Sequence, residues 1–323
     1  MKRKLFLAAL LAIFTALTSV AQTVEEVNAK ILGPANLNFR KFSKRVVISD
    51  FHVKYQVAME LEDSQKGGKM WRGGLRGDAK ATLDLVLDGL DPDQLQKLTD
   101  ELYTSYVAEL KAQGFEVAPI EELWNHEAYS KDREGRWELV PGNGPGDSGE
   151  YGVIFTRATN GKFVVPKNYG GMYVGATVGK INNKEKDFIY NSVSLVVTIF
   201  EDSQGELSKA LNRHAKAAQV KAETNFKISE DSKVWFGMGT VYPKGGVEVT
   251  DVIEKQKFES GQNAARDKMG TDFGVLRVWE VENKEKKNYA TVECNPEKYL
   301  KGTELGANAF LKEAIQVLVK KAN

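Results

Sequence analysis

The stretch after residue 91 carries the pattern that most restricts the fold, because it predicts a long amphipathic helix. Asp91 suits the N-cap, Pro92 the first turn and Gln94 a capping box, and Gly114 is a natural residue just past the C-terminus. Between these signals the apolar residues recur at steps of three and four: Leu95, Leu98, Leu102, Tyr106 and Leu110. A helix with one apolar stripe must bury it against another element. We therefore predict a helix over 92–113 that packs on a larger apolar surface.

A β-sheet supplies that surface, since the residues that follow Val46 alternate in character. Phe51, Val53, Tyr55, Val57 and Met59 are separated by His52, Lys54, Gln56 and Ala58. This period of two places the first set on a buried face and the second on a wet face. Further strands are predicted at 81–87, 115–117, 152–157, 191–200, 217–228, 233–239, 273–281 and 289–293. Their close spacing favours antiparallel pairing.

A second amphipathic helix is predicted at the C-terminus, over 303–321. Its apolar residues fall on one face: Leu305, Phe310, Leu311, Ala314, Ile315 and Leu318. Lys320 and Lys321 follow where the helix dipole favours cations. The fold class is therefore α+β, a mainly antiparallel sheet packed with amphipathic helices.

The first residues have the pattern of a cleavable secretory signal peptide. Lys2, Arg3 and Lys4 form a basic start, an apolar run follows over 5–17, and small residues lead to Ala21. The apolar run is shorter than the roughly 20 residues that a membrane-spanning helix needs. We predict cleavage between Ala21 and Gln22, export to the periplasm or cell envelope of a bacterium, and no integral membrane segment after cleavage.

The composition argues against an intramolecular disulfide and against binding to nucleic acid. The chain has a single cysteine, Cys294, so an exported protein of this sequence must rely on its apolar core without an intramolecular disulfide. Its 45 lysines and arginines nearly balance its 44 aspartates and glutamates, and the two signs are interleaved. A nucleic-acid-binding protein would carry a basic excess, which this chain lacks.

The same patterns divide the chain into successive parts. We predict a signal peptide over 1–21 and an N-terminal arm over 22–44. An α/β unit over 45–140 and a β-rich unit with the C-terminal helix over 151–323 follow, and we expect them to pack as one compact body. The Gly- and Pro-rich segment 141–150 is predicted to be the loop between them.

Residues that could carry chemistry are few. His52, His126 and His214 are the only histidines, and no two have the spacing of metal ligands. Gly146-Asp147-Ser148-Gly149 is similar to the nucleophile motif of trypsin-like proteases, but it lacks the family's next glycine and the surroundings that its histidine needs. We predict no catalytic residue, no cofactor and no metal. A hydrolase whose site is assembled from scattered groups, and is therefore not readable from the sequence, is the remaining enzymatic alternative.

A glycine-rich basic stretch, residues 65–80, is predicted to be an exposed loop. Met70, Trp71 and Arg72 lie in it between glycine pairs, where the backbone cannot easily bury large side chains. We predict that these three residues contact a partner. The alternative is that Met70 and Trp71 fold back onto their own domain.

Aromatic residues in the β-rich half allow a second function. Phe188, Tyr190, Trp235, Phe236 and Met238 could line a cavity for an apolar ligand such as a lipid. They could equally be ordinary core residues, because aromatic side chains at strand spacing are what a packed sheet needs.

One resemblance spans residues 46–123. Val46-Val47-Ile48-Ser49-Asp50-Phe51 is followed by a helix with Leu98-Thr99-Asp100-Glu101-Leu102, then by Gly114-Phe115-Glu116-Val117 and Glu121-Glu122-Leu123. This order resembles the α/β domain of the curli-transport lipoprotein (CsgG-like) family and the similar TolB N-terminal domain. The chain departs from that family in lacking its lipidated cysteine and in a long insertion over 60–91.

The resemblance implies an envelope-assembly or oligomeric scaffold role carried by the fold. Together with the leader, it leads us to expect a non-enzymatic exported envelope protein. Such a protein would act through contacts with a protein partner or through self-association.

Overall fold

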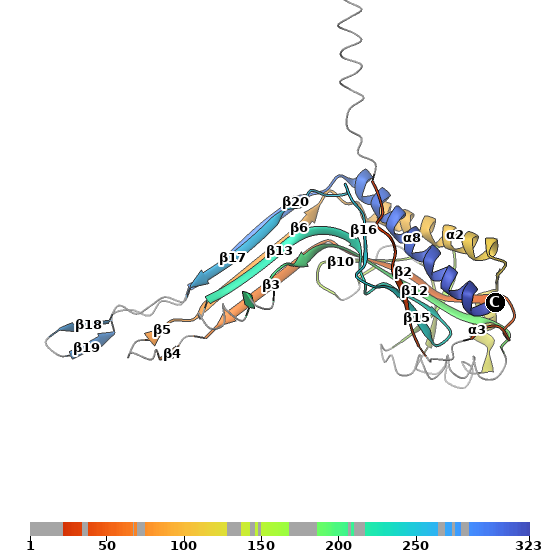
Figure 1. The fold of residues 1–323 in the computed structure, drawn as a ribbon, viewed down its shortest axis with the longest axis horizontal. Coiled ribbons are helices and arrows are strands. Elements are labelled where there is room, and N and C mark those ends of the chain that lie inside the picture. Colours follow the sequence, from red (N-terminus) through yellow and green to blue (C-terminus); the bar gives the residue numbers. More distant parts are fainter. Residues whose placement is uncertain are drawn as a thin grey trace, which may run out of the picture.

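The computed structural model has a helix-covered lobe and a long β-arm that projects from it (Figure 1). It describes residues 22–33, 38–66, 68–69, 75–127, 137–142, 146–147, 150–167, 186–205, 208–209, 217–263, 269–272, 275–278 and 284–323. The α+β prediction is confirmed, since two long helices pack on sheets whose pairings are mostly antiparallel.

The lobe contains one mixed sheet with the order β1-β15-β14-β12-β2-β10-β9. Strand β2 (Arg45–Gln56) is central, and it pairs in parallel with β12 (Ile189–Asp202) and with the short β7 (Glu116–Val117). The other strands of this order are β1 (Ala29–Leu32), β9 (Gly146–Asp147), β10 (Val153–Arg157), β14 (Lys233–Phe236) and β15 (Gly239–Pro243). The ranges 45–140 and 151–323 thus contribute strands to the same sheet.

Two helices lie side by side on one face of this sheet (Figure 1). Helix α2 (Pro92–Ala112) ends one residue before the predicted 113, and Asp91 caps it by accepting a hydrogen bond from the Asp93 amide. Its stripe packs on the buried side chains of β2, Phe51, Val53 and Tyr55. The local pattern was sufficient to predict this helix because capping and stripe agree.

Helix α8 (Pro296–Ala322) begins seven residues before the predicted start at 303. Asn295 is its N-cap and Pro296 its first residue. Two glycines in the first turns weaken the sequence signal, but the structure shows why they are there. A Cβ at Gly302 would lie 2.4 Å from Val252 Cγ2, so a side chain at this position would hold the helix away from the connection between two strands over 249–256.

A smaller apolar cluster covers part of the opposite face of the sheet. Helix α3 (Ile120–Asn125), β8 (Trp137–Pro141) and β11 (Lys162–Pro166) form this cover, and β8 and β11 pair antiparallel. The buried members of the cluster are Val47, Ala118, Leu123, Trp137, Val164, Phe188 and Tyr190. Beside this cover, the face carries polar and charged side chains of β2 and β10, including His52, Lys54 and Arg157.

The arm is built from two chain segments and the far half of β13 (Ala217–Ile228) (Figure 1). The first segment forms the first hairpin, with strands β3 (Ala58–Gln65), β4 (Gly68–Lys69), β5 (Leu75–Arg76) and β6 (Ala79–Asp88). The second segment contains β17 (Lys257–Asn263), β18 (Met269–Asp272), β19 (Val275–Val278) and β20 (Lys284–Glu293). Its strands β18 and β19 pair with each other, whereas β17 pairs with β13 and β20 pairs with β6. Strand β13 completes the arm, and β16 (Val247–Glu248) pairs with its near end.

The prediction of a loop over 65–80 is therefore wrong for the described residues of that range. Gln65, Lys80 and the short strands β4 and β5 belong to a hairpin. Likewise, Gly146–Asp147 within the predicted loop 141–150 forms β9 and pairs with β10. Cross-strand pairing overrides the low strand propensity of glycine at these positions.

In the arm, the sheet β3-β6-β20 packs on β13 and β17. Strand β6 pairs antiparallel with β3 and in parallel with β20. The inward-facing side chains are large beside the lobe, including Leu85, Leu87 and Phe226, and small toward the tip, including Ala79, Ala81 and Ala218. The arm thus has a thin apolar interior that narrows along its length.

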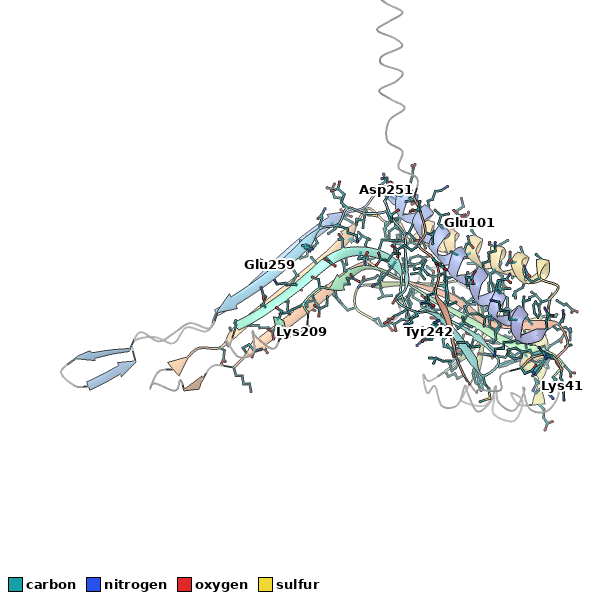
Figure 2. All side chains as sticks on the ribbon, viewed as in Figure 1. Lys41, Glu101, Lys209, Tyr242, Asp251 and Glu259 are labelled. Carbon is teal, nitrogen blue, oxygen red and sulfur yellow. The ribbon has the colours of Figure 1, made fainter. Side chains whose placement is uncertain are left out.

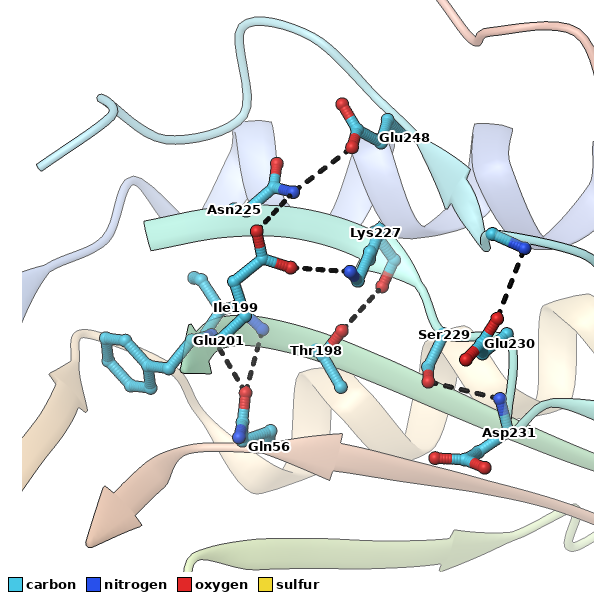
Figure 3. Close-up of polar contacts among 12 residues, drawn as sticks. Gln56, Thr198, Ile199, Glu201, Asn225, Lys227, Ser229, Glu230, Asp231 and Glu248 are labelled. Carbon is cyan, nitrogen blue, oxygen red and sulfur yellow. Dashed lines mark hydrogen bonds and ion pairs between the residues drawn. The ribbon is translucent and has the colours of Figure 1, made fainter. Parts of the chain in front are cut away.

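The strands bend where the arm leaves the lobe, a region that we call the waist (residues 56–58, 198–200, 222–226, 249–256 and 293–298). Gln56 Oε1 accepts hydrogen bonds from the amides of Ile199 and Phe200, at an irregularity in the pairing of β12 with β13 (Figure 3). The hydroxyl of Thr224 accepts from Gln256 N at 2.7 Å and donates to Glu254 O at 2.7 Å. Side chains thus satisfy the backbone groups that the bend removes from the ladders.

The N-terminal segment follows the edge of the lobe from Gln22 onward. Val24 forms a bridge with Val249, and β1 pairs antiparallel with β15. In the part of the chain that the structure describes, no helix combines the length and apolar character needed to cross a membrane.

Candidate functional site

The arm is the feature that distinguishes this fold from a plain helix-covered sheet, and its two layers are joined along both margins. On one margin, Asp63 Oδ2 of β3 accepts a hydrogen bond from the Gln219 amide of β13 at 3.0 Å. On the other, Asn288 Nδ2 of β20 donates to the Glu259 carbonyl of β17 at 2.8 Å. These bonds occupy backbone groups at strand edges, which would otherwise be open to pairing with other strands.

The two outer faces of the arm differ in charge. On the face formed by β12, β13 and β17, cross-strand ion pairs neutralise the charged side chains. Lys227 Nζ lies 2.5 Å from Glu201 Oε2, and Asn225 bridges Glu201 and Glu248 (Figure 3). Lys221 pairs with Glu259 at 3.6 Å; Glu259 is labelled on the arm in Figure 2. We call this the ion-paired face.

We call the outer face of β3-β6-β20 the acidic face, because carboxylates outnumber basic groups among the side chains that the structure describes on it. These carboxylates are Glu60, Glu62, Asp84, Asp88 and Glu293. Two pairs of like charge lie directly opposite each other in the ladders: Glu60 opposite Asp84, and Asp88 opposite Glu293. Among the described side chains of this face, the ion pair is Lys80 with Glu62 at 3.0 Å. Like charges in register destabilise a sheet, so this face is not optimised for the isolated chain.

An aromatic side chain lies in the middle of the acidic face. Tyr289 of β20 is 68% exposed, and it is the register partner of Asp84. A large exposed side chain bordered by carboxylates is typical of a contact surface. This face as a whole has no local sequence signature, because strand register brings together residues about 200 positions apart. The alternating acids of 60–62 and 84–88 were the available signal.

The predicted contact residues Met70, Trp71 and Arg72 lie outside the described residues. The strands on either side of them, β4 and β5, pair antiparallel at the far end of the first hairpin (Figure 1). The prediction that these three residues contact a partner stays a prediction.

A second charged cluster lies on the polar face of the lobe sheet. Asp50 Oδ2 is 2.9 Å from His52 Nδ1, and Asp50 Oδ1 accepts from Arg157 Nε at 2.8 Å. The Arg157 guanidinium lies 5.0 Å from the centre of the Phe155 ring. The centres of the His52 and Phe155 rings are 5.1 Å apart. Burial raises the pKa of Asp50, but His52 and Arg157 lower it by more, so the net pKa is below its usual value.

This cluster is chemically self-contained. An Asp–His pair activates a nucleophile only when a hydroxyl or thiol is within hydrogen-bond reach of the other ring nitrogen. No such hydrogen bond to His52 occurs among the described residues, although Ser194 is its register partner on β12. The arrangement orders three side chains on neighbouring strands, and we assign it to stability.

We expect Asp50→Asn to lower the free energy of unfolding at neutral pH by about 1–3 kcal/mol, because it leaves Arg157 without its carboxylate. The depressed pKa of Asp50 means that this contribution is present above the unfolded value of about 3.9 and is lost as the pH falls through the folded pKa. Urea unfolding of both proteins between about pH 3 and pH 7 measures it.

The exposed pair Lys54–Glu150, at 2.6 Å, provides the control for that measurement. Glu150→Gln should change the free energy of unfolding by less than about 0.5 kcal/mol. A difference between wild type and Asp50→Asn that stayed constant into the acid range would contradict the assignment.

The aromatic residues considered for an apolar cavity do not gather around one space. Phe188 and Tyr190 belong to the small cluster that α3, β8 and β11 cover, and Trp235 packs against it. Phe236 packs instead in the main core beneath α2 and α8, and Met238 is exposed in the turn after β14. These residues pack on two opposite faces of the sheet.

A pocket of about 870 Å³ opens at the waist. It lies between the β16–β17 connection, the end of β20 and the start of α8. The residues that line it are Thr250, Asp251, Val252, Ile253, Glu254, Gln256, Thr291, Val292, Glu293, Asn295 and Lys298. Its size suits a small molecule, but its polar and acidic lining does not suit a lipid.

The remaining reactive groups are dispersed. Cys294 is half-buried at the start of α8, and burial raises the pKa of its thiol to about 11, which makes it a poor nucleophile. His126 stacks edge-on against Phe188 at 5.7 Å, and His214 lies outside the described residues. No three His, Cys, Asp or Glu side chains are placed to hold a metal ion in the described ranges.

No known protein family, curated protein or solved structure matches the chain. The similarity of residues 46–123 to the CsgG-like and TolB domains therefore stays a sequence-based prediction, and the function has to be argued from the geometry.

Proposed function

We propose that this protein is a non-enzymatic, exported subunit of a bacterial envelope assembly, and that it binds a second copy of itself through the acidic face of its arm. The observation that carries this proposal is the like-charged pair Glu60 and Asp84, which are register partners on that face beside the exposed Tyr289. Such contacts cost stability in the isolated chain, and a basic partner surface would relieve the cost.

The chain itself contains a suitable basic segment. Between Gln65 and Gly77 the sequence carries Lys66, Lys69, Arg72 and Arg76 with no acidic residue, and Trp71 lies among them. A segment of this composition complements an acidic face with an exposed tyrosine. Contact between the segment of one copy and the acidic face of the next would be head-to-tail, which builds rings or filaments.

Neutralising carboxylates of the acidic face should change the stability of the single chain and its self-association in opposite directions. In Glu60→Gln/Asp84→Asn we expect the free energy of unfolding to rise by about 0.2–1 kcal/mol, because a like-charge pair is removed. Association should weaken at least tenfold at low salt. Chemical unfolding and sedimentation equilibrium on the purified protein measure the two effects.

Two further variants complete the test. Glu223→Gln/Glu259→Gln, on the ion-paired face, removes the same number of charges and should leave association unchanged. The charge reversal Arg72→Glu should abolish assembly, and Glu60→Lys in the same chain should restore part of it. Unchanged assembly in Glu60→Gln/Asp84→Asn would refute the proposed contact.

A further inference from the structure

The lining of the waist pocket has more negative than positive charge. Asp251 and Glu254 come from the β16–β17 connection, Glu293 comes from the end of β20, and Lys298 comes from the first turn of α8. Lys298 Nζ pairs with Asp251 Oδ2 at 3.1 Å. Among the described residues, Glu254 and Glu293 take part in no ion pair. The pocket therefore favours an additional cation.

The N-terminal segment places one residue directly beside this pocket. Gln22 Nε2 donates to the Lys298 carbonyl at 2.8 Å and lies 3.5 Å from the Asp251 carbonyl. Next to it, the Thr23 and Thr250 hydroxyls are 2.9 Å apart, and the Thr250 amide donates to Thr23 O. Asp251 is labelled in Figure 2 at the waist, near the start of α8. The side chain of Gln22 is thus bonded to the backbone of two residues that line the pocket, Asp251 and Lys298.

Gln22 is also the residue that the sequence predicts to follow the cleaved leader. Before cleavage its nitrogen is a neutral amide, and after cleavage it is an α-ammonium with a reference pKa of about 7.7–8.0. We infer that the waist pocket is the binding site of this new ammonium, with Glu254 and Glu293 as its counter-ions. Removal of the leader would then create the cation that joins the N-terminal segment, the start of α8 and the arm.

This inference rests on the proposed export and processing, and it has a definite dependence on pH. Carboxylates around an ammonium favour its charged form, so the pKa of the Gln22 amine should be raised by folding. The stabilisation is then complete below the unfolded pKa of about 8 and is lost as the pH rises through the folded pKa. The charged residues that line the pocket are Asp251, Glu254, Glu293 and Lys298, and Glu25 and Glu26 lie on the same segment as the amine. No histidine lines the pocket.

The test compares the exported protein with a variant that has one asparagine inserted between Ala21 and Gln22. The insertion moves the ammonium by about 3.5 Å per added residue while it keeps the charge. At about pH 6.5 we expect the insertion to lower the melting temperature by about 2–4 °C. At about pH 9.5, where the amine is neutral, the two proteins should melt together.

Intact mass must first show which N-terminus each sample has. It must also show that Gln22 is not cyclised, since attack of the α-amino nitrogen on the side-chain carbon Cδ expels ammonia and removes the charge. A sample that still carries its leader would refute the processing prediction alone. Correctly processed samples test the pocket.

Paired substitutions identify the counter-ions. Glu254→Gln/Glu293→Gln should remove the difference between the two N-termini at about pH 6.5. Glu297→Gln, which changes an exposed acid on the same first turn of α8 outside the pocket, should preserve it. Equal melting of the two N-termini at both pH values, or a difference that survives Glu254→Gln/Glu293→Gln, would overturn the inference.

Discussion

Replacing Trp71 with alanine is expected to weaken self-association by about 2 kcal/mol or more, which is roughly a 30-fold increase in the dissociation constant. An interface tryptophan contributes on this scale because it buries a large rigid surface against its partner. The melting temperature of the dissociated protein should change little, since a contact residue adds nothing to the fold of the single chain. Sedimentation equilibrium and thermal unfolding of dilute protein measure the two quantities.

Trp137 supplies the matched control, because it is buried in the cluster beneath α3 and β11. Trp137→Ala should lower the free energy of unfolding by about 3–5 kcal/mol and leave the association of the folded fraction intact. If Trp71→Ala instead lowered the melting temperature and left association intact, Trp71 would be a core residue and the contact hypothesis would be wrong.

The sequence predicts the bounds of a helix well when residues close to its ends determine them. Helix α2 was predicted to within one residue because its cap, stripe and C-terminal glycine act locally. The start of α8 was missed because Gly302 and Gly306 serve a distant purpose. Their missing side chains let the helix approach Val252, Val249 and Ile228, a contact that a periodicity cannot reveal.

The predicted strands at 81–87, 217–228 and 289–293 fall on β6, β13 and β20, but their pairing into an arm could not be predicted, for a related reason. Glycines between Gln65 and Gly77 favour a loop when only local propensity is considered. The stability of the hairpin comes instead from pairing of β6 with β3 and with β20, the latter about 200 residues away. The acidic face depends on that register, so no reading of single strands could predict its opposed carboxylates.

The Asp50–His52–Arg157 cluster of the lobe also combines a local contact, which a sequence can suggest, with a contact that depends on strand register. The sequence pattern placed His52 on a wet face, and the structure pairs it with Asp50 two residues away. Arg157 joins them only because β10 lies beside β2 in a particular register. The waist pocket is lined by two separate stretches, within 250–256 and 291–298, and neither stretch carries a local signature of a pocket.

Replacing Leu85 with alanine should have the largest effect on the arm, at a cost of about 2–5 kcal/mol. Leu85 is 1% exposed and lies in the thin interior between the two arm layers. Alanines occupy many of the neighbouring inward positions, so few large side chains can move to fill the cavity. We expect hydrogen exchange to accelerate in β3, β6 and β20, while α2, α8 and β2 stay protected by the lobe core.

Val86→Ala is the control on the same strand. Val86 points to the acidic face and is only partly buried, so truncating it should cost less than about 1 kcal/mol of unfolding free energy and leave hydrogen exchange unchanged.

The exchange pattern of Leu85→Ala shows whether the arm unfolds separately from the lobe. Because the interior of the arm narrows to alanine and serine toward the tip, its strands should open before the lobe does. Exchange that accelerated equally in α8 and β6 would instead mean that arm and lobe unfold as one cooperative unit, and the arm could not then rearrange on a partner without loss of the whole fold.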